Sequence, residues 1–161
     1  DAYEQAVFWL LGSFSLSGWK EVWLLLPYFL LALIISEYFA PEMNLLALGD
    51  EVAQSLGCPV KSIRKLFLFL ATLLASFSVA VAGIIGFVGL IVPHSVRLLI
   101  GPDHRRLFLF SALTGGMMLV FCDLLARTVF SPSEIPIGVI TAALGAPFFI
   151  YLLNRRRRGG S

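Results

Sequence analysis

The sequence predicts an all-α, polytopic integral membrane protein with about five transmembrane helices, and composition is the first reason. Hydrophobic residues make up 58% of the 161 residues and charged residues only 14%, whereas roughly a quarter of the residues in a soluble domain are charged. The mean hydropathy is +0.89. The second reason is that the apolar residues form runs long enough to cross a bilayer. With a net charge of +2 and only 2 cysteines, neither nucleic-acid binding nor a disulfide scaffold is indicated.

Four apolar stretches reach the length of about 20 residues that a bilayer crossing requires. They cover residues 22–39, 66–92, 107–130 and 135–153. The second stretch is ambiguous, because at ~1.5 Å per residue it would form a helix of roughly 40 Å, too long for one upright crossing. Gly83 and Gly86 mark a place where a helix can end and the chain reverse. Two short crossings, the second reaching Ile100, then bring the total to five.

The basic residues favour this division, because lysine and arginine collect on the cytoplasmic side of membrane helices. With five crossings, all of the 12 basic residues except Lys20 and Arg127 fall on one side. The residues on that side are Lys61, Arg64, Lys65, Arg97, Arg105, Arg106 and Arg155 to Arg158. Residues 1–161 then form a single transmembrane domain, with the N-terminus outside and the C-terminus cytoplasmic. Residues 1–21 are expected to form an outer interfacial segment.

The longest cytoplasmic connection in this topology covers residues 42–60. Its apolar residues recur at spacings of three and four: Leu45, Leu48, Val52 and Leu56. This pattern predicts an amphipathic helical unit. Gly49 is expected to divide it into two short helices, with Asp50 as the N-cap of the second and Gly57 at its C-terminal end. Periodicity alone leaves open whether the unit packs on its own spans and the membrane surface or docks a cytoplasmic protein.

Three segments carry a resemblance to a known family. They are NLLALGDEVAQSLG (44–57), GIIGFVGLIVPHSVRLLIGPDHRR (83–106) and DLLARTVFSPSEIPIGVITAALGAPFFIYLL (123–153). In this order and spacing, they resemble the C-terminal half of FecCD-type permeases, the membrane subunits of type II ABC importers for ferric siderophores, haem and cobalamin. The resemblance extends over the chain from about Trp9. It implies that this sequence is the last five spans of a ten-helix permease of a bacterial plasma membrane, preceded by the outer segment.

The resemblance also implies partners and site residues. In this family the two short helices of the cytoplasmic loop enter a cleft of the ATPase, and the residues matching that motif are Leu48, Gly49, Asp50, Glu51, Ala53, Leu56 and Gly57. ATP and Mg are then bound by the partner ATPase, and this chain is a transport subunit that binds no cofactor and no metal. It contains no GxxxxGK[ST] run. The other implied partners are a second permease copy and a substrate-binding protein, which docks at the position matching Arg127.

Small residues within the spans predict close helix packing. Gly83, Gly86 and Gly89 repeat every three residues and are expected to share much of one helix face, for packing rather than for a substrate path. The last span contains three residues expected to interrupt its helix: Gly138, Gly145 and Pro147. Interrupted helices at membrane depth often line cavities. The resemblance implies the same, because the last span of the family helps to line the translocation pathway.

Polar residues near or within the spans have structural explanations. His94 is expected to be a hydrogen-bonded residue at the end of the third span, and His104 a solvated residue in a polar turn. Asp103 in the same turn is expected to cap the following helix. Asp123 and Arg127, four residues apart, share one helix face, which predicts an intrahelical ion pair that lowers the cost of membrane insertion; a proton-coupling role for Asp123 is the alternative.

Two other functions are left open by the residues themselves. An ion-coupled secondary transporter or channel half would use Asp123, Glu134 or His94 as its titrating groups. A non-transporting assembly subunit of a membrane complex would need none of them. A membrane enzyme is disfavoured, because no nucleophile, base and metal cluster converges at one depth.

Overall fold

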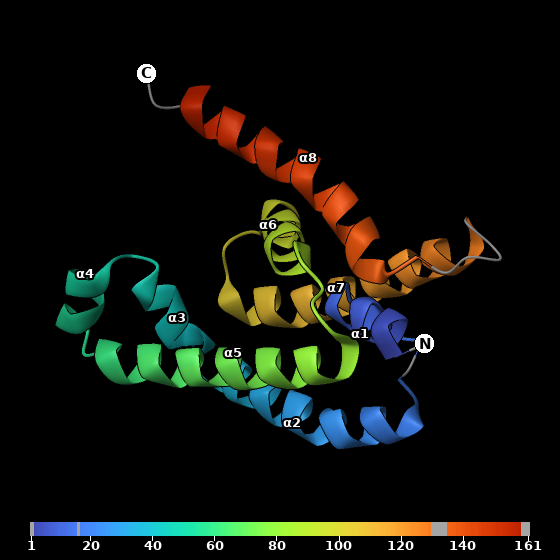
Figure 1. The fold of residues 1–161 in the computed structure, drawn as a ribbon. Helices are drawn as coiled ribbons and strands as arrows, with labels where there is room; N and C mark the ends of the chain where they lie inside the picture. The colour runs from blue at the N-terminus through green and yellow to red at the C-terminus, as the bar shows by residue number, and fades with distance from the viewer. Residues whose placement is uncertain (1, 16, 130–134, 159–161) are drawn as a thin grey trace.

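The computed structural model describes residues 2–15, 17–129 and 135–158, and all regular structure in these ranges is helical (Figure 1). The helices are α1 (Ala2–Leu10), α2 (Trp19–Tyr38), α3 (Ala40–Leu46), α4 (Asp50–Ser55), α5 (Val60–Ala82), α6 (Val88–Ile100), α7 (His104–Thr128) and α8 (Ile137–Arg158). Helices α2, α5, α7 and α8 are long and apolar enough to cross a membrane, and α6 is a shorter apolar helix. The predicted all-α polytopic fold is confirmed.

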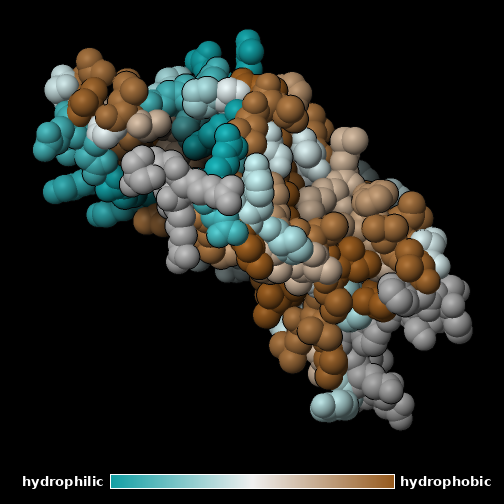
Figure 2. All heavy atoms as spheres, turned by 90° about the horizontal axis from the view of Figure 1, so that it is seen from above, coloured by the Kyte–Doolittle hydropathy of each residue, from teal (hydrophilic) through white to brown (hydrophobic). Residues whose placement is uncertain are grey.

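The long helices run in two opposite directions, and α5 and α7, which α6 separates in the chain, run the same way (Figure 1). In Figure 1, α5 and α7 run from left to right with increasing residue number, whereas α2 and α8 run back towards the left. All basic residues except Lys20 and Arg127 lie at the start of α5 and α7 or towards the end of α6 and α8, so they gather at one end of the bundle. Hydrophilic side chains collect at this left-hand end in Figure 2, and the rest of that face is mostly hydrophobic.

The ambiguous apolar stretch is divided where the glycines predict. Helix α5 ends at Ala82, Gly83 has a φ of 72°, and the chain is not helical again until Val88. The two helices are unequal, however, which differs from the expected pair of short crossings. Helix α5 starts directly after Pro59 and has 23 residues. Residues 83–87 form a non-helical connection, which leaves α6 with only 13 residues, or roughly 20 Å.

The expected helix face of Gly83, Gly86 and Gly89 does not exist, because only Gly89 lies within a helix. Gly83 ends α5, and Gly86 belongs to the non-helical connection. The packing role of Gly83 takes another form: the carbonyl oxygen of Trp9 occupies the space that a Cβ atom would need. The C-terminal end of α1 is therefore held directly against the C-terminal end of α5.

Helix α8 is continuous, so Gly138, Gly145 and Pro147 do not interrupt it as expected. Proline is tolerated in membrane helices where neighbouring groups satisfy the freed backbone carbonyl. Both glycines instead allow close approach: Gly138 faces the carbonyl of Leu11, and Gly145 faces the Cβ atom and ring of Phe87. Phe87 itself has a φ of 66°, which is unusual for a residue with a side chain.

Gly145→Ala is expected to lower the thermal stability of the full-length protein, because the added methyl would overlap the base of the Phe87 side chain. Overpacking costs about 1–3 kcal/mol, more than the ~1 kcal/mol that alanine gains over glycine within a helix. In the matched control Gly115→Ala, the methyl would lie 3.9 Å from Val92 Cγ1, an ordinary contact. Thermal unfolding in detergent measures both, and equal midpoints would contradict the prediction.

Helix α7 lies at the centre of the described fold. Its first half packs on α6 through Val92, Val96 and Leu107, and its second half packs on α8 through a cluster that includes Cys122 and Ile137. It also contacts α2 and α3. Any element that moves α7 therefore acts on most of the bundle.

Candidate functional site

Helices α3 and α4 form a hairpin at the polar end of the molecule. Between them, Gly49 has a φ of 108° and a ψ of 153°, a conformation essentially restricted to glycine. After α4, Gly57 has a φ of 84°, and Pro59 precedes α5. The predicted division into two short helices is confirmed. One detail differs: Gly49 occupies the N-cap position, and Asp50 is the first helical residue.

The inner side of the hairpin packs on the start of α5. Ala53 is 0% exposed and forms a cluster with Cys58, Val60 and Ile63. Partly buried side chains surround this cluster: Phe39, Met43, Leu45, Leu46 and Phe67. Ala53, one of the residues matching the coupling motif, therefore positions α4 and presents no surface to a partner. The Cys58 side chain is also buried.

The outer side of the hairpin exposes large apolar side chains. Leu48 is 63% exposed, Val52 44% and Leu56 60%. Asp50 and Glu51 are exposed beside them. The amphipathic pattern is thus real, but most of its apolar residues face away from the protein, because α4 uses Ala53 for its inner contact. An exposed apolar cluster with a charged rim is typical of a protein interaction site.

Two polar contacts tie the hairpin to the long helices. Arg64 Nη2 on α5 donates to Asp50 Oδ1 at 2.8 Å, in an exposed ion pair. The second contact joins α3 to the start of α7. Asn44 Nδ2 donates to Asp103 Oδ1 at 2.9 Å, and Asn44 Oδ1 accepts from the backbone N–H of His104 at 2.9 Å and lies 2.7 Å from His104 Nδ1.

Asp103 and His104 begin α7 in different surroundings. Asp103 caps the helix as predicted, accepting from the Arg105 N–H at 3.1 Å. The hydrogen bonds from Asn44 and Arg105 hold the pKa of Asp103 below its usual value, so the carboxylate is charged at neutral pH. The expectation of a solvated His104 was wrong, since this residue is 8% exposed and its ring lies 5.7 Å from that of Phe108.

His94 differs from expectation in two respects. It lies in the middle of α6 rather than at a helix end, and its buried Nε2 has no hydrogen-bond partner in the described part of the chain. With Phe149 and Arg155, it lines a cavity of about 560 Å³ between α6 and α8. No group of three histidine, cysteine, aspartate or glutamate side chains suited to a metal occurs among the described residues. Glu134 lies outside those residues.

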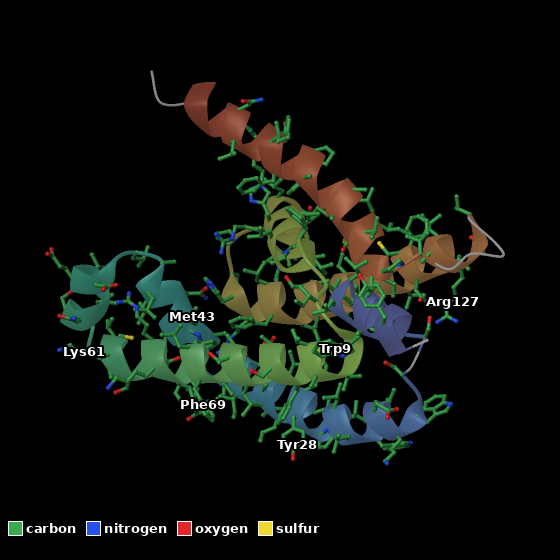
Figure 3. All side chains as sticks on the ribbon, viewed as in Figure 1. Trp9, Tyr28, Met43, Lys61, Phe69 and Arg127 are labelled. Carbon is green, nitrogen blue, oxygen red and sulfur yellow. The ribbon has the colours of Figure 1, made fainter. Side chains whose placement is uncertain are left out.

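Asp123 and Arg127 lie towards the far end of α7. Arg127 Nε donates to Asp123 Oδ2 at 2.9 Å, so the predicted intrahelical ion pair is confirmed. The Arg127 side chain is 46% exposed and that of Asp123 26%. Figure 3 shows Arg127 at the end of the bundle opposite Met43 and Lys61. The hairpin and Arg127 thus occupy opposite ends of the same set of helices.

Long apolar helices with a helical hairpin at their polar end define the class of this protein, a multi-pass helical membrane protein. Residues 1–155 match the profile described as the FecCD transport family. The chain belongs to that family, and the resemblance found in the sequence is confirmed.

Individual relatives and a solved structure agree with this assignment. The chain is 47% identical over 151 residues to the cobalamin import permease BtuC of Halobacterium salinarum, covering 94% of this chain and 40% of the relative. It is 46% identical over 152 residues to the Fe(3+) dicitrate permease FecD of Escherichia coli, with coverage of 94% and 48%. A structure described as an inward-facing metal-chelate type ABC transporter matches with a TM-score of 0.86 and 38% identity, covering 94% and 49%. The chain spans about half the length of these relatives.

Proposed function

We propose that this chain is part of the membrane-spanning permease of an ABC importer that takes up an iron-siderophore, haem or cobalamin-type ligand. Membership of the FecCD transport family supports this proposal, as do the names of the relatives, which include permeases for cobalamin and for Fe(3+) dicitrate. The chain is a transport subunit, and ATP with Mg is bound and hydrolysed on a separate ATPase. A second permease copy completes the pathway across the membrane.

The hairpin end of the molecule faces the cytoplasm in this proposal. Lys61, Arg64, Arg105 and Arg106 lie at that end, and positively charged residues favour the cytoplasmic side. The N-terminus is then outside and the C-terminus inside. Arg127 at the opposite end faces the compartment from which a substrate-binding protein delivers the ligand.

The exposed outer face of the hairpin is the observation that carries the coupling role. Leu48, Val52 and Leu56 expose apolar surface at the polar end of the molecule, where burying it in a cleft of the ATPase would be favourable. The core around Ala53 makes the hairpin one body with the start of α5. When ATP binding and hydrolysis close and open the ATPase dimer, this body moves with it and shifts the long helices between outward-open and inward-open arrangements.

Leu56→Asp tests this docking face. It is expected to weaken association of the full-length permease with its ATPase about tenfold, because burying a leucine side chain contributes roughly 1.5–3 kcal/mol. Ser62→Asp adds the same charge in the exposed first turn of α5 and serves as the control. Co-purification from detergent measures both variants. If Leu56→Asp associates as tightly as the wild type, this face is not the docking surface.

A further inference from the structure

The hydrogen bonds around Asn44 leave only one arrangement of its side-chain amide. The Asp103 carboxylate can only accept, so Asn44 Nδ2 must face it, and the backbone N–H of His104 can only donate, so Oδ1 must face that group. His104 Nδ1, 2.7 Å from the same Oδ1, must then carry a hydrogen and donate. One side chain of α3 therefore makes three mutually dependent bonds to the start of α7.

These bonds satisfy groups that α7 cannot satisfy by itself. The first N–H groups of a helix have no partner within it. The N–H of His104 is bonded to Asn44, and that of Arg105 to Asp103, which Asn44 holds in place. Because His104 is buried, breaking the arrangement would strand polar groups away from water. Helix α3 thus supplies part of the N-terminal cap of α7.

The Asn44 contact is the stronger of the two polar ties between the hairpin and the long helices. The Asp50–Arg64 pair joins side chains that are 50% and 56% exposed, and exposed pairs contribute little. The Asn44 bonds are partly buried, and one of them is made to a charged carboxylate, which strengthens it. Displacing α3 therefore displaces the start of α7 as well.

We propose that Asn44 is a positioning residue that transmits movement of the α3–α4 hairpin to α7. This inference rests on the proposed function, since it requires an ATPase that moves the hairpin. The Asn44 bonds transmit that movement to α7, and α7 carries it to the opposite end, where Arg127 lies. The hairpin core already makes α5 follow the hairpin, so Asn44 makes α7 follow it too.

Asn44→Asp tests this role. The substitution places a second carboxylate against Asp103 and removes the donor between them. It keeps an oxygen that can accept from the backbone N–H and from Nδ1 of His104, so the bond to Asp103 is the one that is lost. Exchanging the two side chains would not restore the network, because Asp103 Oδ1 also accepts from the Arg105 N–H.

The readout is movement of the far end of α7 in the complete complex. Spin labels at Val22→Cys and Val129→Cys report the distance between the start of α2 and the end of α7, where both native side chains are exposed. The native thiols of Cys58 and Cys122 are buried. The distance distribution is compared with and without ATP and vanadate, in full-length permease bound to its ATPase in nanodiscs, so no transported ligand is needed.

Asn44→Asp is expected to reduce the fraction of complexes showing the ATP-dependent shift about tenfold. Losing a hydrogen bond to a charged group changes an equilibrium constant by about this factor. ATPase association should change less than about twofold, since the docking face is intact. Asn154→Asp, the same substitution at an exposed position of α8, should leave the shift unchanged.

A wild-type shift in Asn44→Asp overturns the proposal. If Asn44→Asp does not assemble, His104→Phe takes its place. It removes the Nδ1 donor and retains a ring beside Phe108, so it should lose the shift, and a normal shift would again overturn the proposal. Failure of the wild-type permease to bind the ATPase would instead contradict the proposed function.

Discussion

Gly49→Pro is expected to abolish association of the full-length permease with its ATPase. Proline requires a φ near −65°, whereas Gly49 has a φ of 108°. The turn between α3 and α4 must therefore be rebuilt, which moves Leu48 and Leu56 apart on the docking face. An incompatible proline costs ~3 kcal/mol or more, so the docking-competent hairpin should be depleted more than about a hundredfold. Co-purification with the ATPase measures the loss.

The control for this variant is Gly18→Ala, at a glycine whose φ of −136° suits any residue. The added methyl meets only Glu21 Oε2 at 3.4 Å. Gly18 precedes α2 at the other end of the bundle, so its substitution should leave ATPase association unchanged. If Gly49→Pro inserts into the membrane and still binds the ATPase normally, the hairpin is not the coupling element.

Features with a local cause were predictable from the sequence. The long helices follow from apolar runs, since nothing but a helix satisfies its backbone in a bilayer. The breaks at Gly49 and Gly83 follow from the backbone freedom of glycine. The cap by Asp103 and the Asp123–Arg127 pair involve residues within four positions of each other, so their spacing was sufficient.

Features that depend on distant contacts were not predictable. From the sequence, Gly138 and Gly145 were expected to interrupt the last span. Their actual role depends on Leu11 and Phe87, which pack against them from other segments of the chain. Periodicity identified the hairpin as amphipathic, yet it did not indicate that Ala53 would face inward. His104 is hydrogen-bonded to Asn44, which is 60 positions away in the sequence. No sequence pattern connects these two residues, so the burial of His104 could not be predicted.

The charged residues at the two ends of α7 have different surroundings. At the hairpin end, Asp103 is bonded to Asn44 and to the helix backbone, so it has a structural role. At the other end, Arg127 is bonded through Nε to Asp123, and nearly half of its side chain is exposed. That ion pair orients the guanidinium without burying it. Such a group suits recognition of a carboxylate on a docking protein.

Arg127→Glu is therefore expected to weaken binding of the importer's substrate-binding protein at least about 30-fold in nanodiscs, because disrupting one partner of a close interfacial charge pair costs about 2–5 kcal/mol. Repulsion between the new glutamate and Asp123, four residues apart, amounts to only ~0.2–0.5 kcal/mol and cannot explain such a loss. Asp123→Asn breaks the intrahelical ion pair but retains the arginine charge, so its binding should stay within about threefold of the wild type. Equal affinity of Arg127→Glu and wild type, measured at low salt where charge attraction is strongest, would remove Arg127 from the docking site.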